Sequence, residues 1–202
     1  MVNLFTLKKF GIRLGLLLIL FFLAGIYLNL GNKIAAVYTN SGNALFKNAF
    51  HQKKVKFKQV KNEAWVVKIE AVHKVLGKQN WCTLNIWGIF YLPFTLYLSL
   101  ILATSFKKWK LKLSSFSVGL LLLISYLYCC QYFKIVFLFH SIEKTEPNFN
   151  YNIWHEMVDK VNVGFIDNVN TYLVMAMLIW LFIVVQTVDF SLSKTPIKGV
   201  KY

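Results

Sequence analysis

The first residues that could bind a metal or transfer protons are two of the histidines, His140 and His155, and the acids near them. His140 and Glu143 are three residues apart, a spacing that places two side chains on one face of a helix, and His155 and Glu156 lie in the next segment. Imidazole and carboxylate groups bind zinc and act as general acids and bases. Adjacent residues face different ways in a helix, however, and the sequence contains no HExxH or CxxC pattern. We therefore predict no metal site, no cofactor and no catalytic residue.

Adjacent cysteines offer thiol chemistry. Cys129 and Cys130 lie inside an apolar run, and Cys82 lies at the edge of another. Quinone-linked thiol enzymes of the membrane keep CxxC pairs near the aqueous edge, where a thiolate forms. This pair lies about ten residues, or about 15 Å of helical rise, inside its run. Three cysteines cannot all pair, so no disulfide framework is predicted, and we expect Cys129 and Cys130 to be buried and inert.

The third chemical feature is the basic stretch from His51 to Lys78. Five of its lysines fall within nine residues, namely Lys53, Lys54, Lys56, Lys58 and Lys61. Val55 and Phe57 alternate with these lysines, and after the turn-like Lys61-Asn62-Glu63 apolar residues alternate again from Trp65 to Ala71. Alternation with a period of two predicts two strands joined by a short turn. The stretch is therefore predicted to be a small basic β-hairpin.

The two faces of this hairpin are expected to make different contacts. We predict that its apolar face, with Val55, Phe57, Trp65 and Val67, packs around Trp154 on a second loop, at about 140–170. Its lysines repel one another unless an anionic surface or partner offsets their charge. The predicted contact residues for lipid or a partner are Lys53, Lys54, Lys56, Lys58, Lys61, Trp65 and Trp154.

Two interpretations of the anionic side remain open. Anionic membrane lipids attract such lysines, each contributing about 1 kcal/mol near the surface, and a polyanionic glycan or an acidic protein segment would attract them as well. Nucleic-acid binding is excluded, because proteins that recognise nucleic acids do so largely through Arg on water-exposed surfaces. Here the net charge of +15 comes from lysines and a single arginine, and these residues lie between apolar runs.

Long apolar runs set the architecture around these residues. The chain has 202 residues and is 57% hydrophobic, which is too apolar for a soluble core of that size. Four runs approach the roughly 20 residues that a helix needs to cross a bilayer, at about 14–30, 84–106, 116–139 and 172–188. We predict an α-helical integral membrane protein with a single membrane domain over residues 1–202. Its fold class is a four-helix transmembrane bundle with a small extracytoplasmic β-hairpin and an interfacial helix.

The two outer loops of this arrangement cover about 31–83 and 140–170. In Tyr151–Val163, apolar residues recur at helical spacing and predict the interfacial helix, lying on the membrane or on the hairpin. Ala35–Phe50 is predicted to be an amphipathic segment broken at Ser41-Gly42-Asn43. Apart from Lys134 near an end, the four runs hold no ionisable residue, so transport by this chain alone is not expected.

Orientation in the membrane is predicted from the basic flanks. The N-terminus, the turn at 107–112 and the C-terminal tail together carry ten basic residues and one acid. The other two loops carry twelve basic residues over more than twice the length, together with seven acids. Lys8, Lys9 and Arg13 border the first run directly. We predict an uncleaved anchor, both termini in the cytoplasm and the hairpin outside, in the cytoplasmic (inner) membrane of a bacterium.

The order of these features resembles a known family. An anchor runs into YLNLGNKIAAVYTNSGNALF (Tyr27 to Phe46), and a strand pair containing WVVKIE (Trp65 to Glu70) comes after it. Over roughly the first 80 residues, this layout is similar to the small membrane proteins that accompany exosortases in Bacteroidota. Exosortases use a membrane Cys with extracytoplasmic Arg and His for transpeptidation, whereas the only arginine here, Arg13, is on the predicted cytoplasmic flank. The resemblance therefore implies a partner of the enzyme and not the enzyme.

Three functional hypotheses remain. The first is a non-catalytic accessory or scaffold protein of the inner membrane, which presents the basic outer module to an integral-membrane partner in an exosortase-type protein sorting system. The second is a membrane enzyme of envelope processing that uses His140, Glu143, His155 and Glu156. The third is a subunit of a transporter. Copurification in mild detergent separates them, because only the first and third require a stoichiometric partner.

Overall fold

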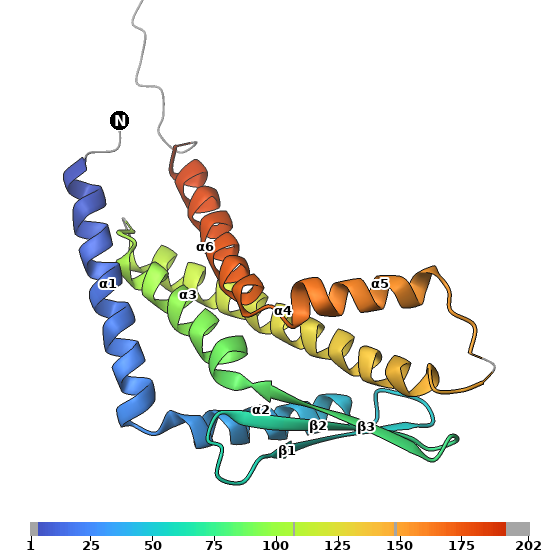
Figure 1. Cartoon of the computed structure of the whole chain (residues 1–202). Coiled ribbons are helices and arrows are strands. Elements are labelled where there is room, and N and C mark those ends of the chain that lie inside the picture. The colour runs from blue at the N-terminus through green and yellow to red at the C-terminus, as the bar shows by residue number, and fades with distance from the viewer. Residues whose placement is uncertain (1–3, 107, 148, 193–202) are drawn as a thin grey trace, which may run out of the picture.

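Helices form most of the chain and hold one small sheet at one end of the molecule (Figure 1). The structure, a computed structural model, describes residues 4–106, 108–147 and 149–192. In chain order the elements are α1 (Leu4–Tyr27), α2 (Leu30–Phe46), β1 (Lys53–Gln59), β2 (Val66–His73), β3 (Lys78–Asn85), the π-helical turn η1 (Trp87–Tyr91), α3 (Leu92–Ala103), α4 (Trp109–Glu143), α5 (Ile153–Val161), the π-helical turn η2 (Asn162–Ile166) and α6 (Val169–Leu192).

Three of these helices are long and apolar enough to cross a membrane. They are Lys8–Tyr27 in α1, Trp109–Glu143 in α4 and Val169–Gln186 in α6, which correspond to the runs expected at 14–30, 116–139 and 172–188. The run expected at 84–106 differs. Its first two residues are the last two of strand β3, and most of the rest forms the shorter apolar helix Trp87–Ala103. Of the four predicted spans, three are therefore long helices and one is short.

A sharp bend separates α1 from α2. Asn29, between the two helices, has a φ of 46°, in the left-handed region that Asn adopts more readily than most residues. α2 then runs without interruption through Ser41-Gly42-Asn43, where the sequence led us to expect a break. Gly42 is required there because a Cβ at this position would lie 2.7 Å from the ring of Phe57 on β1. The glycine serves close packing and not a turn.

The sheet has three antiparallel strands in the order β1-β2-β3. β1 and β2 are the predicted hairpin, in the register that places Phe57 opposite Ile69. The third strand was not predicted. β3 comes after a turn in which Gly77 has a φ of 63°, and it pairs Cys82 with Ile69. The predicted hairpin is thus part of a three-stranded sheet.

One face of the sheet is buried. Its apolar side chains are at most 1% exposed, namely Val55, Phe57, Val67, Ile69 and Ala71. They pack in one cluster with residues of α2 and α4 that include Tyr38, Phe46, Ile135 and Phe139. The prediction that this face packs around Trp154 is wrong. Trp154 belongs to α5 and is 50% exposed, and α4 lies between α5 and the sheet (Figure 1).

A second core joins α3, α4 and α6. Tyr97, Leu123, Tyr172 and Ala176 are buried in it, and the hydroxyl of Tyr97 donates a 2.8 Å hydrogen bond to the carbonyl of Ser115 on α4. Lys134 of α4 is also buried, and its ammonium pairs with Asp167 just beyond η2 at 2.5 Å. α4 therefore packs on the sheet and α2 through the first core and on α3 and α6 through the second.

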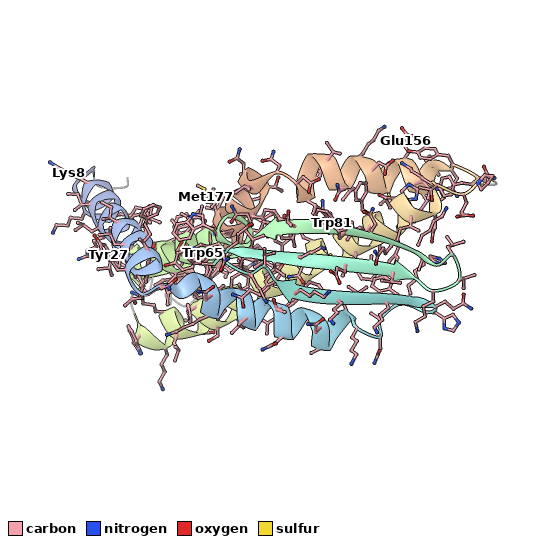
Figure 2. The ribbon with its side chains drawn as sticks, turned by 60° about the horizontal axis from the view of Figure 1, so that its bottom comes forward. Lys8, Tyr27, Trp65, Trp81, Glu156 and Met177 are labelled. Atoms are coloured by element: carbon pink, nitrogen blue, oxygen red, sulfur yellow. The ribbon has the colours of Figure 1, made fainter. Side chains whose placement is uncertain are left out.

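The first described turn of α1 and the last described turn of α6 lie at the same end of the molecule, near the connection from α3 to α4 (Figure 1). The sheet lies at the opposite end, beyond the bend between α1 and α2. Figure 2 turns this end towards the viewer, and the strands then lie in front of α4, with α2 beside them.

Candidate functional site

The first candidate site is the open face of the sheet. Because side chains alternate along a strand, the register of the strands places Lys54, Lys56 and Lys58 of β1 on the face opposite to Val55 and Phe57. The same register puts Lys68 and Glu70 of β2 and Trp81 of β3 beside them. We call these side chains the basic face: Lys54, Lys56, Lys58, Lys68, Glu70 and Trp81.

The charges of the basic face are only partly balanced. Glu70 accepts ion pairs from Lys58 at 2.6 Å and from Lys68 at 3.3 Å. The hydrogen bond from Lys58 is the main reason why the pKa of the Glu70 carboxyl lies below its ordinary value. Neither Lys54 nor Lys56 has an ion-pair partner in the described part of the chain. Four ammonium groups and one carboxylate leave this face strongly positive.

An aromatic side chain completes the basic face. Trp81 is 57% exposed, and the ammonium of Lys68 lies 4.6 Å from its ring centroid. Figure 2 shows Trp81 on the sheet, with Trp65 at the end of the sheet nearest to α1. An exposed Trp offers an apolar contact beside the charges of the lysines, and Trp is one of the residues enriched where proteins bind one another.

The remaining predicted contact residues are dispersed. Lys53 is on the other side of the sheet and pairs with Glu143 of α4 at 2.6 Å. Lys61 is exposed in the turn after β1. Trp65 is half-buried and packs edge-on against Trp87, with ring centroids 4.7 Å apart. With Trp154 on α5, only Lys54, Lys56 and Lys58 of the seven share one face. Sequence reasoning missed Lys68 as a contact residue, although its alternation with Val67 and Ile69 was visible, and missed Trp81 because β3 was not expected.

The second candidate site lies where α5 packs on the last turns of α4. His140 and Glu143 of α4 and His155 of α5 each offer one ligand atom, and these three atoms lie within 4.8 Å of one another. The rings of His140 and His155 are stacked, with centroids 4.4 Å apart. Asp159, one turn after His155, places Oδ1 3.6 Å from Nε2 of His140. We call these four residues the histidine cluster.

The start of α5 holds His155 in place. Asn152 caps the helix: its side chain accepts from the backbone N–H of His155 at 3.2 Å, and the backbone N–H of Asn152 donates to Nδ1 of His155 at 3.2 Å. This reciprocal capping box satisfies donors that a helix start otherwise leaves free. Glu156, which the sequence grouped with His155, is exposed and pairs with Lys160 at 2.6 Å. Glu156 is therefore not part of the cluster.

Polar groups in the histidine cluster are buried without full compensation. His140 is 3% exposed, and both of its ring nitrogens lack a hydrogen-bond partner in the described part of the chain. Oδ1 of Asp159 is buried and unpaired as well. Burial raises the pKa of the Asp159 carboxyl, but hydrogen bonds from Lys144 and Tyr151 outweigh this effect and hold the pKa below its ordinary value. Since buried polar groups are normally paired, the cluster is chemically incomplete.

A half-open pocket of about 350 Å³ adjoins this cluster. Its walls include Phe50, Tyr132, Trp154 and Val158, and His140, Glu143 and His155 lie along it. Lys53 also reaches it from β1. The pocket therefore gives the cluster access to small molecules or ions from outside.

Comparison with known proteins adds no assignment. The chain matches no protein-family model, no curated protein and no solved structure.

The cysteines give no further site: Cys130 is buried as expected, but Cys129 is exposed on the apolar surface of α4.

Proposed function

We propose that this protein is a multi-pass protein of a bacterial cytoplasmic membrane, with α1, α3, α4 and α6 in the bilayer. Many large apolar side chains of the long helices face outward, among them Leu16 of α1 at 64% exposure, Leu121 of α4 at 66% and Phe182 of α6 at 57%. Continuous apolar surface of this kind is rare on soluble monomers, and lipid chains would cover it.

The basic flanks favour termini in the cytoplasm and a sheet on the outer side. α1 begins and α6 ends at the end of the molecule opposite to the sheet (Figure 1), which supports placing the termini and the sheet on opposite sides of the membrane. Reporter fusions test it: a fusion at Ser114 is expected to behave as cytoplasmic and a fusion at Asn62 as extracytoplasmic. The reverse pattern would refute the orientation.

Within the membrane, we propose the role of a non-catalytic accessory protein that docks an acidic partner on the basic face. The observation that carries this proposal is the pair of lysines without an ion-pair partner in the described part of the chain, Lys54 and Lys56, on the same face of the sheet as the exposed Trp81. The opposite face of the sheet packs on α2 and α4, so the basic face points away from the helices proposed to lie in the bilayer. An acidic segment of another envelope protein fits that direction better than the headgroups of the same membrane.

The layout of the first 80 or so residues suggests which partner to test first. It resembles proteins that accompany exosortases, so the proposed partner is an integral-membrane enzyme of that type or an acidic segment of a protein it sorts. In this role the chain contributes position and charge, and the enzyme contributes the chemistry.

The test compares two triple variants by copurification from mild detergent. Changing Lys54, Lys56 and Lys58 together to Gln is expected to release the partner at lower salt than in the wild type and to flatten the salt dependence, because ionic strength screens exposed charges. The control replaces three exposed lysines outside the basic face, Lys33, Lys47 and Lys74, by Gln. If the first variant retains its partner as well as the control does at low salt, the docking role is wrong.

A further inference from the structure

We propose that His140, His155 and Glu143 bind a divalent transition metal, and that Zn²⁺ is the ion that fits them best. This site is distinct from the basic face: it lies where α5 packs on the last turns of α4, next to Lys53 and His73 on the opposite face of the sheet. Neither the sequence pattern nor the proposed docking role requires it.

The main observation is His140. It is 97% buried, since 3% of its surface is exposed, and neither ring nitrogen has a hydrogen-bond partner in the described part of the chain. Leaving a polar group buried and unpaired is costly. A metal ion would bind the lone pair of one nitrogen. A small approach to Oδ1 of Asp159, now 3.6 Å from Nε2, would give the ring N–H a carboxylate acceptor, the usual partner of a metal-bound histidine.

The geometry needs a modest contraction. The three ligand atoms lie within 4.8 Å of one another, whereas ligands at the usual Zn–N distance of about 2.0 Å stand about 3.3 Å apart in a tetrahedral site. His155 and Glu143 are only half-buried, so their side chains can rotate inward. Binding through Nε2 of His155 moves its proton to Nδ1, and the hydrogen bond from the backbone N–H of Asn152 is then given up. One neutral hydrogen bond is a small loss compared with metal coordination.

The donor set selects the class of ion. Two imidazoles and one carboxylate are a ligand set of catalytic zinc sites, whereas Mg²⁺ and Ca²⁺ prefer oxygen ligands. Three protein ligands leave one coordination position, and the pocket beside Phe50 and Tyr132 reaches the cluster there. A water molecule or a small ligand would take that position.

Lysines compete with the ion. Lys53 holds Oε1 of Glu143 at 2.6 Å, and Lys144 holds Oδ2 of Asp159 at 2.5 Å. The Lys53 ammonium repels a divalent ion bound to Glu143. Because Lys53 belongs to β1, metal binding at α4 and α5 competes directly with a link to the sheet. This competition predicts opposite effects from removing the ligand and from removing the lysine.

The experiment uses the full chain in detergent, stripped with a chelator and titrated with Zn²⁺, with Co²⁺ as an absorbing substitute and Mg²⁺ as a hard-ion control. One equivalent of Zn²⁺ is expected, with Co²⁺ bands that indicate nitrogen ligands and no competition from Mg²⁺. Glu143→Gln and His155→Gln should each weaken Zn²⁺ binding at least about 10-fold, the size of effect that even outer-shell partners produce. Glu156→Gln, at the exposed neighbour of His155, should leave binding unchanged.

Lys53→Met is expected to change the Zn²⁺ affinity in the opposite direction from the ligand variants. Removing its ammonium should tighten Zn²⁺ binding about 10-fold or more, because a nearby unit charge is a large term in a partly buried site. Absence of stoichiometric Zn²⁺ binding overturns the proposal. So does binding that Glu143→Gln and His155→Gln leave intact, binding that Glu156→Gln weakens equally, or binding that Lys53→Met weakens.

Discussion

Asn43 takes the place of a fourth strand beside β1. Its side-chain carbonyl accepts a 2.8 Å hydrogen bond from the backbone N–H of Phe57, and its amide donates a 3.0 Å hydrogen bond to the Phe57 carbonyl. β1 is the edge of the sheet, and Phe57 and Ile69 form a pair whose backbone groups on β1 point outward to Asn43. An Asn→Leu change at position 43 should remove both bonds. At about 1 kcal/mol net for each bond, we expect a loss of about 2 kcal/mol.

That loss can be measured by thermal unfolding in detergent. For a chain of this size, about 2 kcal/mol corresponds to a drop of about 4 to 8 °C in Tm. Asn43→Asp is the sharper variant, because it keeps the acceptor for the Phe57 N–H but puts a carboxylate oxygen against the Phe57 carbonyl. At neutral pH it should destabilise about as much as Leu, and below about pH 4, where Asp is protonated, the restored O–H donor should recover part of the loss.

Asn40→Asp is the matched control. Asn40 lies one turn earlier on α2 and is exposed, so the same chemical change there should shift Tm little and without recovery in acid. If Asn43→Asp behaves as Asn40→Asp does, or if Asn43→Leu costs less than about 0.5 kcal/mol, the pairing of Asn43 with the edge of β1 does not contribute to stability.

Two further predictions concern the bundle core and the basic face. Gly119→Ala should destabilise the bundle by about 1–3 kcal/mol, as overpacking does, because the new Cβ would meet the Tyr97 hydroxyl. Gly15→Ala is the control, because a Cβ there would have nothing within 4 Å, and it should not destabilise the bundle. Equal melting temperatures of the two variants in detergent would contradict the close packing at Gly119. The Glu70 pKa is lowered by Lys58, so its contribution is present above the ordinary pKa of about 4.3 and is lost as the pH falls through the lowered value. The wild type should exceed Glu70→Gln in stability by under about 1 kcal/mol at pH 7, since the pair is partly exposed, and unfolding curves at successive pH values should converge below pH 4; a gap that persists in acid would contradict the assignment.

Periodicity predicted the elements that have a simple period. The alternation of Val55 and Phe57 with lysines gave both the strand and its buried face, and the apolar runs gave α1, α4 and α6. The sequence pattern did not predict β3, because the residues on its inward face are Asn80, Cys82 and Leu84, and only Leu84 is strongly apolar. Its last residues were also assigned to the next apolar run. A strand whose buried face is partly polar has no period that hydrophobicity alone reveals.

The histidine cluster was visible only in part. His140 and Glu143 have helical spacing within α4, and the sequence identified that pair. His155 reaches them because the chain reverses between α4 and α5, and the angle of that reversal depends on contacts such as the one between Lys144 and Asp159. Local sequence does not encode such an angle. The same limit explains why Gly42 and Asn43 looked like a turn: their partner, Phe57, is 14 or more residues away along the chain.

The length of α4 has a mechanical consequence. Its 35 residues extend about 52 Å at 1.5 Å per residue, whereas the hydrocarbon layer is about 30 Å thick. In the proposed membrane arrangement, about 20 Å of one continuous helix would stand outside the bilayer, and both the sheet and α5 pack on that portion. A change in bilayer thickness alters the tilt of a spanning helix, and the rigid outer part of α4 would convert the tilt into a sideways displacement of the sheet and α5 as one unit. Membrane thickness would thereby set the reach of the outer module.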